Sequence, residues 1–416
     1  MAAINHPSAK FDSSLALLSE GYRFMPRRFE ALGADVFATR LMLRRVVCMR
    51  GEAAARMFYA PGRFTRCAAP ATLALLQDAG SAQVLDGAAH RQRKELLLAI
   101  LGDDSRAHLV GLAMREWSAS FARWPGMRQV MLHHAAEAVL CRAACAWAGV
   151  PLGAAESGQR TAEFSAMIDG AGSTGPRNLK AQLLRSRTER WARQLIDLAR
   201  AGEIGAPDSP LQALARARDQ QGRPVKRDDA AAELINLLRP AVAVARFITF
   251  GALAMHDHPE WRERLASGDD AALTMFTQEV RRFYPFFPAV GGRATEGFDW
   301  EGVRIDKGTL VVLDLYGTDH HPALWGDPEV FRPERFEGWH DNSYALVAQG
   351  GGDYLGGHRC AGEPATIELV KSALHLLAAR VRYRVPQQDL RISLARMPTL
   401  PASGFVLDSV RLVAGV

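Results

Sequence analysis

The sequence predicts a mostly α-helical protein that carries small β-sheets. Apolar residues recur at three- and four-residue spacing, which is the period of an amphipathic helix. Ala, Leu, Arg and Glu, which favour helices, are abundant. Strand-like runs are short and late, such as Gly308 to Leu313 after a charged turn. The periodic stretches predict helices over residues 132–149, 184–201, 229–256 and 361–380.

The organisation along the chain favours one structural unit. Its 416 residues leave room for two ordinary domains or one large one, and no internal repeat or low-complexity linker divides them. The most loop-like stretch runs from Gly202 to Gly222, but it lies between strong helices and is interpreted as a surface connection. We therefore expect a single domain over residues 1–416.

Composition and charge exclude several classes of protein. With 48% hydrophobic and 23% charged residues, the chain has the balance of a globular protein. The net charge of +6 comes from arginines spread along the chain without a Lys/Arg block, which argues against a nucleic-acid partner. Met1 to Met25 contains no apolar run long enough for a signal peptide or membrane anchor. We therefore expect a cytoplasmic protein.

The cysteines form an odd and scattered set without the paired spacing of a zinc site or a disulfide framework. Cys141 and Cys145 are four apart and share a helical face, where packing is favoured over metal binding. Four of the five are interpreted as core residues: Cys48, Cys67, Cys141 and Cys145.

The fifth cysteine, Cys360, lies in a glycine-rich segment that runs from Gln349 to Glu363 and is followed at once by a helical pattern. A cysteine at a helix start meets exposed amide groups and the helix dipole, which lower the thiol pKa and favour a thiolate ligand. The preceding glycines let the backbone approach a flat, bulky partner. Taken alone, the segment fits equally well a glycine-rich turn with a buried cysteine.

Two further motifs decide the interpretation of Cys360. Glu279 and Arg282 stand three apart and share a helical face, and Arg335 in Pro-Glu-Arg-Phe offers a second cation. Alone, such a pair is usually a surface salt bridge. The order Glu-x-x-Arg, Pro-Glu-Arg-Phe and Cys-x-Gly, however, resembles the cytochrome P450 superfamily.

The resemblance implies the P450 fold, in which a haem lies between a long distal helix and the proximal cysteine loop. It implies haem b as cofactor, with Cys360 as the axial thiolate on the iron. It also implies that Glu279, Arg282 and Arg335 form a buried structural triad.

Two departures from the usual P450 pattern point to the fatty-acid peroxygenase branch. Asp353 and His358 replace the usual Phe and Arg before the cysteine, and the long helix carries Arg239-Pro240 where most members have Gly-x-x-Thr with an acid. Ala361, where the branch usually has Pro, and Arg246, where it has an apolar or aromatic residue, depart from the branch itself. The chain matches the branch at residues 20–22, 86–90, 233–236, 278–285, 313–317 and 403–406.

Membership of this branch implies hydrogen peroxide as oxidant, a long-chain fatty acid as substrate and no dedicated reductase. A guanidinium within an apolar helix is costly unless an anion meets it, and Arg239 would hold the substrate carboxylate as the acid-base group. Pro240 would kink the helix and open space over the haem. Spacing alone fits equally well a solvent-facing Arg239 beside Arg246. A carboxylate fixed near the iron exposes the α carbon, or less favourably the β carbon, to oxidation.

The resemblance also assigns residues around the haem. His90 and Lys94, one helical turn apart, fall where the superfamily contacts a haem propionate. A solvated basic face shared with Arg91 and Arg93 is the alternative from the residues alone.

Other positions bear on the acyl pocket and the product. Phe286, Phe287 and Val290 fall where the family lines its acyl pocket, although plain core packing explains them as well. Ala171 resembles the α-hydroxylating members, whereas β-hydroxylating ones place Phe there. Gln83 stands where hydroxylating members carry Gln and alkene-forming ones His. An amide is not a proton donor near neutral pH, whereas imidazole titrates there; an isolated Gln would otherwise be read as a polar loop residue.

Three other functions remain open from the sequence. One is decarboxylation of a fatty acid to a terminal alkene. Another is a reductase-dependent haem-thiolate monooxygenase acting on a terpene or steroid, against which Arg239-Pro240 argues. The third is a haem-binding sensor or carrier without turnover, against which the carboxylate anchor argues. The preferred expectation is peroxide-dependent α-hydroxylation.

Overall fold

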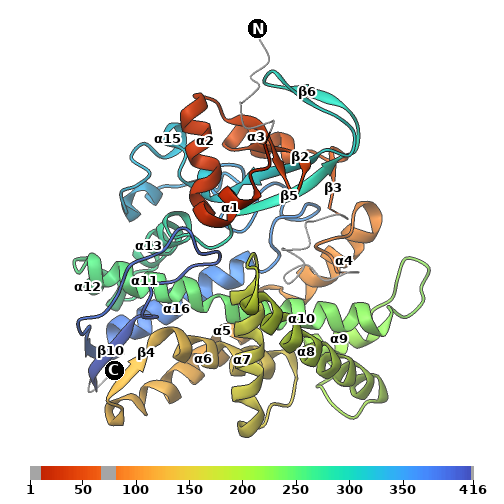
Figure 1. Cartoon of the computed structure of the whole chain (residues 1–416). Helices are drawn as coiled ribbons and strands as arrows, with labels where there is room; N and C mark the ends of the chain where they lie inside the picture. The colour runs from red at the N-terminus through yellow and green to blue at the C-terminus, as the bar shows by residue number, and fades with distance from the viewer. Residues whose placement is uncertain (1–10, 67–80, 414–416) are drawn as a thin grey trace.

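Helices form most of the molecule, and the largest sheet lies at one end, in the computed structural model, which describes residues 11–66 and 81–413 (Figure 1). The α-helices are α1 (Ser14–Glu20), α2 (Phe24–Leu32), α3 (Glu52–Phe58), α4 (Gly87–Ile100), α5 (Asp103–Phe121), α6 (Leu132–Ala148), α7 (Ala154–Gly170), α8 (Pro176–Ala201), α9 (Pro210–Arg216), α10 (Arg227–Ala243), α11 (Ala245–Asp257), α12 (Trp261–Ala266), α13 (Asp270–Phe283), α14 (Leu315–Asp319), α15 (Pro322–Trp325) and α16 (Glu363–Arg380). Short 3-10 turns cover Gly21–Arg23, Trp124–Gly126 and Pro333–Phe336.

The strands form three sheets. They are β1 (Val36–Leu41), β2 (Arg44–Met49), β3 (Phe64–Thr65), β4 (Gln129–Met131), β5 (Ala289–Ala294), β6 (Phe298–Trp300), β7 (Val303–Ile305), β8 (Leu310–Asp314), β9 (Val381–Arg384) and β10 (Val406–Leu412). The largest sheet has the order β1-β2-β8-β5-β3, in which only β2 and β8 run parallel. The predicted mostly α-helical class with small sheets is therefore confirmed.

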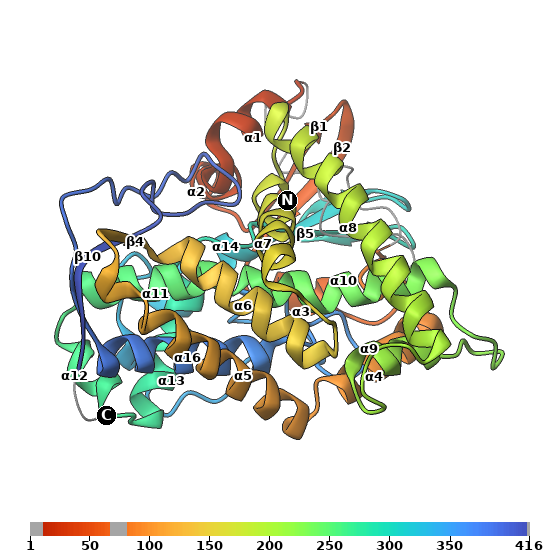
Figure 2. The same cartoon turned by 90° about the horizontal axis from the view of Figure 1, so that it is seen from below.

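The helical core is built around α10 and α11, which run across the middle of the molecule and pack on α6, α8, α13 and α16 (Figure 2). The stretch Arg227–Asp257 is long and apolar enough to span a membrane by length and composition, but 89% of its most apolar window is buried inside the protein. The pair is therefore a core element. It is interrupted at Val244, one turn after Pro240, which cannot donate a backbone hydrogen bond.

The predicted elements and the observed ones agree best where the apolar period is long. The helices expected over 132–149 and 361–380 are α6 and α16, and the strand expected over 308–313 is β8. The interpretation of 202–222 as connection only is wrong, because residues 210–216 form α9. Ser209 caps this helix, Pro210 occupies its first turn, and its residues Leu211 and Leu214 are buried.

Other sequence predictions fall partly outside the described residues. Of the N-terminal stretch 1–25, residues 1–10 lie outside them, and Cys67 does as well. Cys48, Cys141 and Cys145 are buried core residues, as expected.

The segment before the cysteine loop is fixed by a buried cluster of charges on α13. The Glu279 carboxylate accepts two hydrogen bonds from Arg282, at 2.7 and 2.8 Å, and one from Arg335 at 3.2 Å. Arg282 also donates to the carbonyls of Asp319 and Pro328 at 2.9 and 3.0 Å. The structure thus brings the three predicted triad residues together and connects them to the chain between α14 and the Pro333–Phe336 turn.

Replacing Glu279 by Gln should destabilise the protein strongly, because it leaves two guanidinium groups buried beside an uncharged amide. We expect a loss of about 3–5 kcal/mol in the free energy of unfolding, the usual cost of breaking a buried ion pair. Denaturant titration measures this loss. Glu52→Gln is the matched control, since its bond to Arg56 lies on the surface and should change stability by less than about 1 kcal/mol. Equal effects of the two substitutions would contradict the role given to Glu279.

Candidate active site

The loop around Cys360 follows a path that its glycines make possible. A Cβ at Gly351 would collide with the carbonyl oxygen of Ser343, and one at Gly352 would lie 2.8 Å from the Cβ of Tyr59. The backbone amide of Cys360 donates to the Gln349 carbonyl at 3.3 Å. The side-chain amide of Gln349 lies 3.8 Å from the Cys360 sulfur, so the same residue contacts both the backbone and the thiol of Cys360.

The expected lowering of the thiol pKa by a helix start is not what the structure shows. Helix α16 begins at Glu363, three residues after Cys360. Burial raises the pKa of the Cys360 thiol, and the Glu363 carboxylate adds to the rise, whereas the Gly362 amide and Lys94 oppose it. A bound metal ion deprotonates a coordinating thiol outright, so a thiolate at this position depends on the metal.

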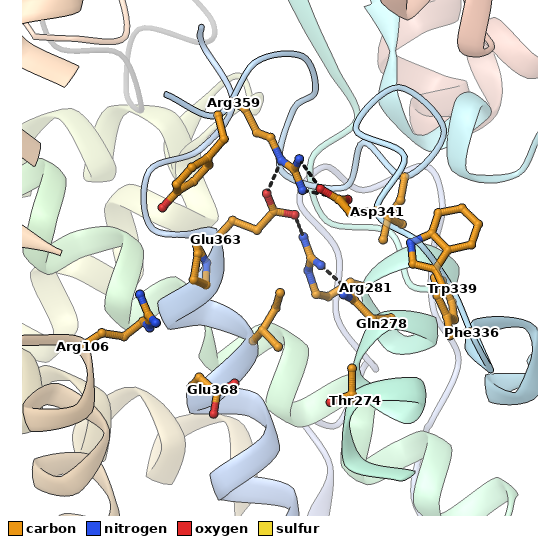
Figure 3. Close-up of a pocket in the computed structure, with 14 residues that line it drawn as sticks. Arg106, Thr274, Gln278, Arg281, Phe336, Trp339, Asp341, Arg359, Glu363 and Glu368 are labelled. Carbon is orange, nitrogen blue, oxygen red and sulfur yellow. Dashed lines mark hydrogen bonds and ion pairs between the residues drawn. The ribbon is translucent and has the colours of Figure 1, made fainter. Parts of the chain in front are cut away.

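A second network of buried charges fixes the other side of the loop (Figure 3). The Glu363 carboxylate lies between two arginines: it accepts a short hydrogen bond from Arg281 of α13 and a bond of 2.6 Å from Arg359. Arg359 also donates to both oxygens of Asp341, at 2.7 and 3.1 Å. Arg281 in turn donates to the side-chain oxygen of Gln349 at 3.2 Å. The network therefore reaches from the surface to the residue beside the thiol.

This network borders a cavity of about 380 Å³ on the side of the loop that faces α13 and α16. Figure 3 shows Arg281, Arg359 and Glu363 pointing toward one another, with Trp339 and Phe336 to their right in the view. Because its polar groups are engaged with each other, the cavity is a poor candidate for substrate binding.

Helix α4 brings two buried basic side chains to the cysteine loop. Lys94, only 3% exposed, donates to the Arg359 carbonyl and lies 5.3 Å from the ring centre of Tyr354. The His90 ring lies 3.9 Å from that of His358. Burial lowers the pKa of both His90 and Lys94. Both side chains are buried, so the solvated basic face considered from the sequence is excluded.

These residues fit a haem. Cys360 supplies a soft sulfur donor, the type of axial ligand found in haem-thiolate proteins. No carboxylate among the described residues comes within 4 Å of the Lys94 ammonium, and a buried cation is stable only when an anion or several acceptors meet it. A haem propionate is an anion that would satisfy this requirement. His90, on the same face of α4, lies one turn away.

The side of α10 that carries Arg239 is tied to the turn containing Gln83. Arg239 is 2% exposed and donates to the Asn236 side-chain oxygen at 2.7 Å. Asn236 is 3.4 Å from the Glu233 carboxylate, which also accepts from the Ala82 backbone amide at 2.7 Å. Gln83 itself is exposed and stands three residues after the stretch 67–80, which lies outside the described residues.

Pro240 differs from its neighbours in exposure. Its side chain is exposed, whereas Leu238, Arg239 and Val242 are buried. Arg239, next to Pro240, does not face bulk solvent, which removes the alternative of a solvent-facing pair with Arg246.

The residues predicted to line the acyl pocket are placed in two groups. Phe286 is buried and its ring packs edge-on against Phe247 of α11, with centres 5.2 Å apart, while Ala171 is buried at the end of α7. Phe287 and Val290 are half-buried and pack toward the sheet that contains β5 and β8. The ring centres of Phe286 and Phe287 are 4.4 Å apart, which joins the two groups.

Arg246, for which the sequence offered no role, is also buried. It donates to the Thr399 carbonyl at 2.9 Å and to the Asp169 carboxylate at 3.3 Å. Asp169 is two residues before Ala171, and Arg396 donates to the same oxygen at 2.7 Å. Arg246 thus links α11 to the end of α7 and to the chain near residue 399.

Sequence reasoning missed the residues that support Cys360 and Arg239 through side-chain contacts. Glu363 and Arg281 carry no motif that separates them from a helical surface pair. Asn236 and Glu233 were noted only as part of the resemblance. Asn236 and Glu233 stand three residues apart on one helix, and this spacing indicated that they could form a hydrogen bond. Spacing alone does not show that the side chains are buried.

Comparison with known proteins identifies the family. The family model for cytochrome P450 matches residues 271–406. Human cytochrome P450 4A11 is 29% identical over 178 residues, 38% of this chain and 34% of the human protein. The chain thus spans about a third of the length of the curated relatives that it matches first.

Solved structures match over nearly the whole chain. Cytochrome P450SP alpha (CYP152B1) in complex with (R)-ibuprophen is 42% identical with a TM-score of 0.94, over 97% of this chain and 99% of that one. Cytochrome P450EX alpha (CYP152N1) with myristic acid is 36% identical with a TM-score of 0.94, over 99% and 100%. Ligand-free cytochrome P450 OleT is 33% identical, also with a TM-score of 0.94, over 97% and 98%. The chain therefore belongs to the cytochrome P450 family, and within it to the fatty-acid peroxygenase branch that these structures represent.

Proposed function

We propose that this protein is a cytoplasmic peroxygenase that uses hydrogen peroxide to hydroxylate long-chain fatty acids at the α carbon, without a dedicated reductase. The observation that carries the proposal is Arg239, a guanidinium buried in the central helix next to the exposed Pro240. The solved relative CYP152N1 contains myristic acid, which supports a fatty acid as substrate. We propose one catalytic domain over residues 1–416.

The cofactor in this proposal is haem b, which Cys360 would hold through its sulfur and which His90 and Lys94 would contact at the propionates. When bound, a haem-thiolate uses peroxide to transfer an oxygen atom to a C–H bond. Gln349 would donate from its side chain to the sulfur, and Arg281 would keep that amide oriented by holding its oxygen.

Arg239 would bind the substrate carboxylate and hold it beside helix α10. Asn236 accepts from the guanidinium and fixes its direction. The carboxylate, held in place, would take up and return the proton that oxygen transfer from peroxide requires, which is the work that an Asp and a Thr do in most P450 proteins. The carbon next to the carboxylate would then lie nearest the reaction, and the far end of the chain would lie out of reach.

The small side chain of Ala171 favours the α over the β position, by resemblance to α-hydroxylating members. Phe286 would line the acyl chain, and Phe287 and Val290 would support it from the side of β5. Decarboxylation to a terminal alkene is the second candidate, because the OleT structure is also a close match.

Arg239→Ala should nearly abolish peroxide-driven oxidation of fatty acids, because it removes the substrate anchor and the means of holding the proton-transfer group. The loss of a buried ion pair corresponds to about 3–5 kcal/mol, or roughly a hundred- to several-thousand-fold in kcat/KM. Arg227→Leu on the same helix is the control, because its side chain is half exposed and should leave the rate unchanged.

A companion measurement supplies a short carboxylic acid together with a small substrate that lacks a carboxyl group. The acid should occupy the position held by Arg239 and permit oxidation in the wild type but not in Arg239→Ala. High activity of Arg239→Ala with intact haem content would rule out the proposed mechanism.

Gln83 should make hydroxylation dominate over alkene formation, since a neutral amide cannot donate a proton near neutral pH whereas a histidine can. The measurement is the ratio of 2-hydroxy acid, 3-hydroxy acid and terminal alkene from one saturated fatty acid, in wild type and in Gln83→His. We expect mostly 2-hydroxy acid from the wild type and a rise in alkene from the variant. Mostly 3-hydroxy acid would refute the α assignment, and mostly alkene from the wild type would refute the role of Gln83.

A further inference from the structure

The hairpin between β1 and β2 ends in a turn whose residues are unusual for its backbone. Leu41 pairs with Arg44, which leaves Met42 and Leu43 as a two-residue loop with φ of 51° and 62°. Asn-Gly is the preferred pair for such a loop, because positive φ is unfavourable for residues with large side chains. Met42 and Leu43 are also 67% and 79% exposed. Neither backbone preference nor burial within the protein explains them.

The same surface carries further exposed apolar side chains. Asp12, just before α1, accepts a hydrogen bond from the backbone amide of Leu43, and Ser14, the first residue of α1, accepts one from the amide of Met42. These bonds fix the loop against this segment. We call the set formed by the loop and the outer face of this segment the tip patch. Its members and their exposures are Phe11 76%, Leu15 81%, Leu18 46%, Met42 67% and Leu43 79%.

The start of α8 extends this apolar surface. Leu179 and Leu183 are 60% and 63% exposed. Arg177, in the same turn, donates to the Met397 carbonyl, and Tyr22, just after α1, donates to the Leu394 carbonyl, so both segments flank one loop. Among the described residues, these two segments hold half of the large apolar side chains that are exposed: seven of fourteen.

Basic side chains surround the tip patch. Arg40, Arg44 and Arg45 are exposed on the hairpin, and Arg40 and Arg45 are Cα partners, a cross-strand pair of like charges that is unfavourable by itself. Lys180 is exposed on α8. The nearby carboxylates are engaged: Asp12 accepts backbone amides, Glu20 pairs with Arg28 at 3.0 Å, and Asp306 lies 3.6 Å from Arg45.

We propose that the tip patch is a docking site for an anionic lipid surface, into which Met42 and Leu43 insert while the surrounding arginines contact phosphate groups. Apolar side chains ringed by Lys and Arg are the pattern of a protein that lies on a membrane without spanning it. A second copy of this chain fits worse, because a symmetric contact would bring the hairpin arginines of both copies together. The inference does not depend on the proposed reaction.

The position of the patch relates it to the acyl pocket. Tyr22 donates to the Phe286 carbonyl at 2.5 Å, so the segment that follows α1 contacts one of the residues proposed to line the acyl chain. Docking through the tip patch would therefore place this side of the pocket toward the lipid, where a fatty acid is dissolved.

The test is sedimentation of the full-length haem-loaded protein with vesicles of phosphatidylcholine alone or mixed with phosphatidylglycerol, without peroxide. We expect binding to the mixed vesicles that weakens as salt is added. The decisive variant is Met42→Asn with Leu43→Gly, which installs the residues that the turn prefers. The partition coefficient of this variant between vesicles and solution should fall by about tenfold or more, since two apolar side chains are no longer transferred from water into lipid. Its melting temperature should equal that of the wild type or exceed it.

The controls separate this role from others. Leu412→Ser removes an exposed apolar side chain on β10, and should leave vesicle binding unchanged. Arg40→Gln with Arg44→Gln should abolish the preference for anionic vesicles. Wild-type protein that stays in solution with mixed vesicles, or a loop variant that binds them as well as wild type does, would overturn the proposal. A dimer in solution that the loop variant dissociates, without vesicle binding, would show that the patch contacts a second copy and would equally overturn it.

Discussion

Buried pairs between arginines and glutamates fix the position of Cys360, and the rest of the site depends on them. Helix α13 contributes to two such clusters. Its Glu279 and Arg282 face the chain that leads into the cysteine loop, while its Arg281 reaches Glu363 in the first turn of α16. Charges buried in this way stabilise one arrangement only if every partner is present. A single helix therefore aligns the segments before and after the thiol.

Hydrogen bonds between polar side chains also fix Arg239 on helix α10. Glu233, Asn236 and Arg239 follow one another at spacings of three on α10 and form a row of hydrogen bonds that ends at a guanidinium. Pro240 follows at once and is exposed. A cation fixed in an apolar helix is suited to bind a carboxylate, because its own position does not have to change when the ligand arrives. Under the proposed function, this fixed guanidinium would let the site select an acid.

Local patterns in the sequence predicted part of the fold and part of the candidate site. The apolar period predicted α6 and α16, and it predicted one helix over 229–256, which the structure divides into α10 and α11. The order of three motifs identified the superfamily. The short helix α9 was missed because seven residues between prolines and charges show too little of the helical period. The partners of Arg246 were missed for a different reason: Asp169 and Thr399 are 77 and 153 residues away, and no local pattern reports such contacts. The pKa of Cys360 was predicted in the wrong direction because burial, which sequence does not reveal, outweighs the helix start.

The most direct test of the central claim is turnover by the purified haem-loaded protein with a long-chain fatty acid and hydrogen peroxide, in the absence of any reductase or reduced nicotinamide. Products are identified by mass spectrometry. The account predicts that the fatty acid is converted to its hydroxy acid with peroxide as the sole oxidant. Recovery of unchanged fatty acid from protein that holds its haem through Cys360 would contradict it.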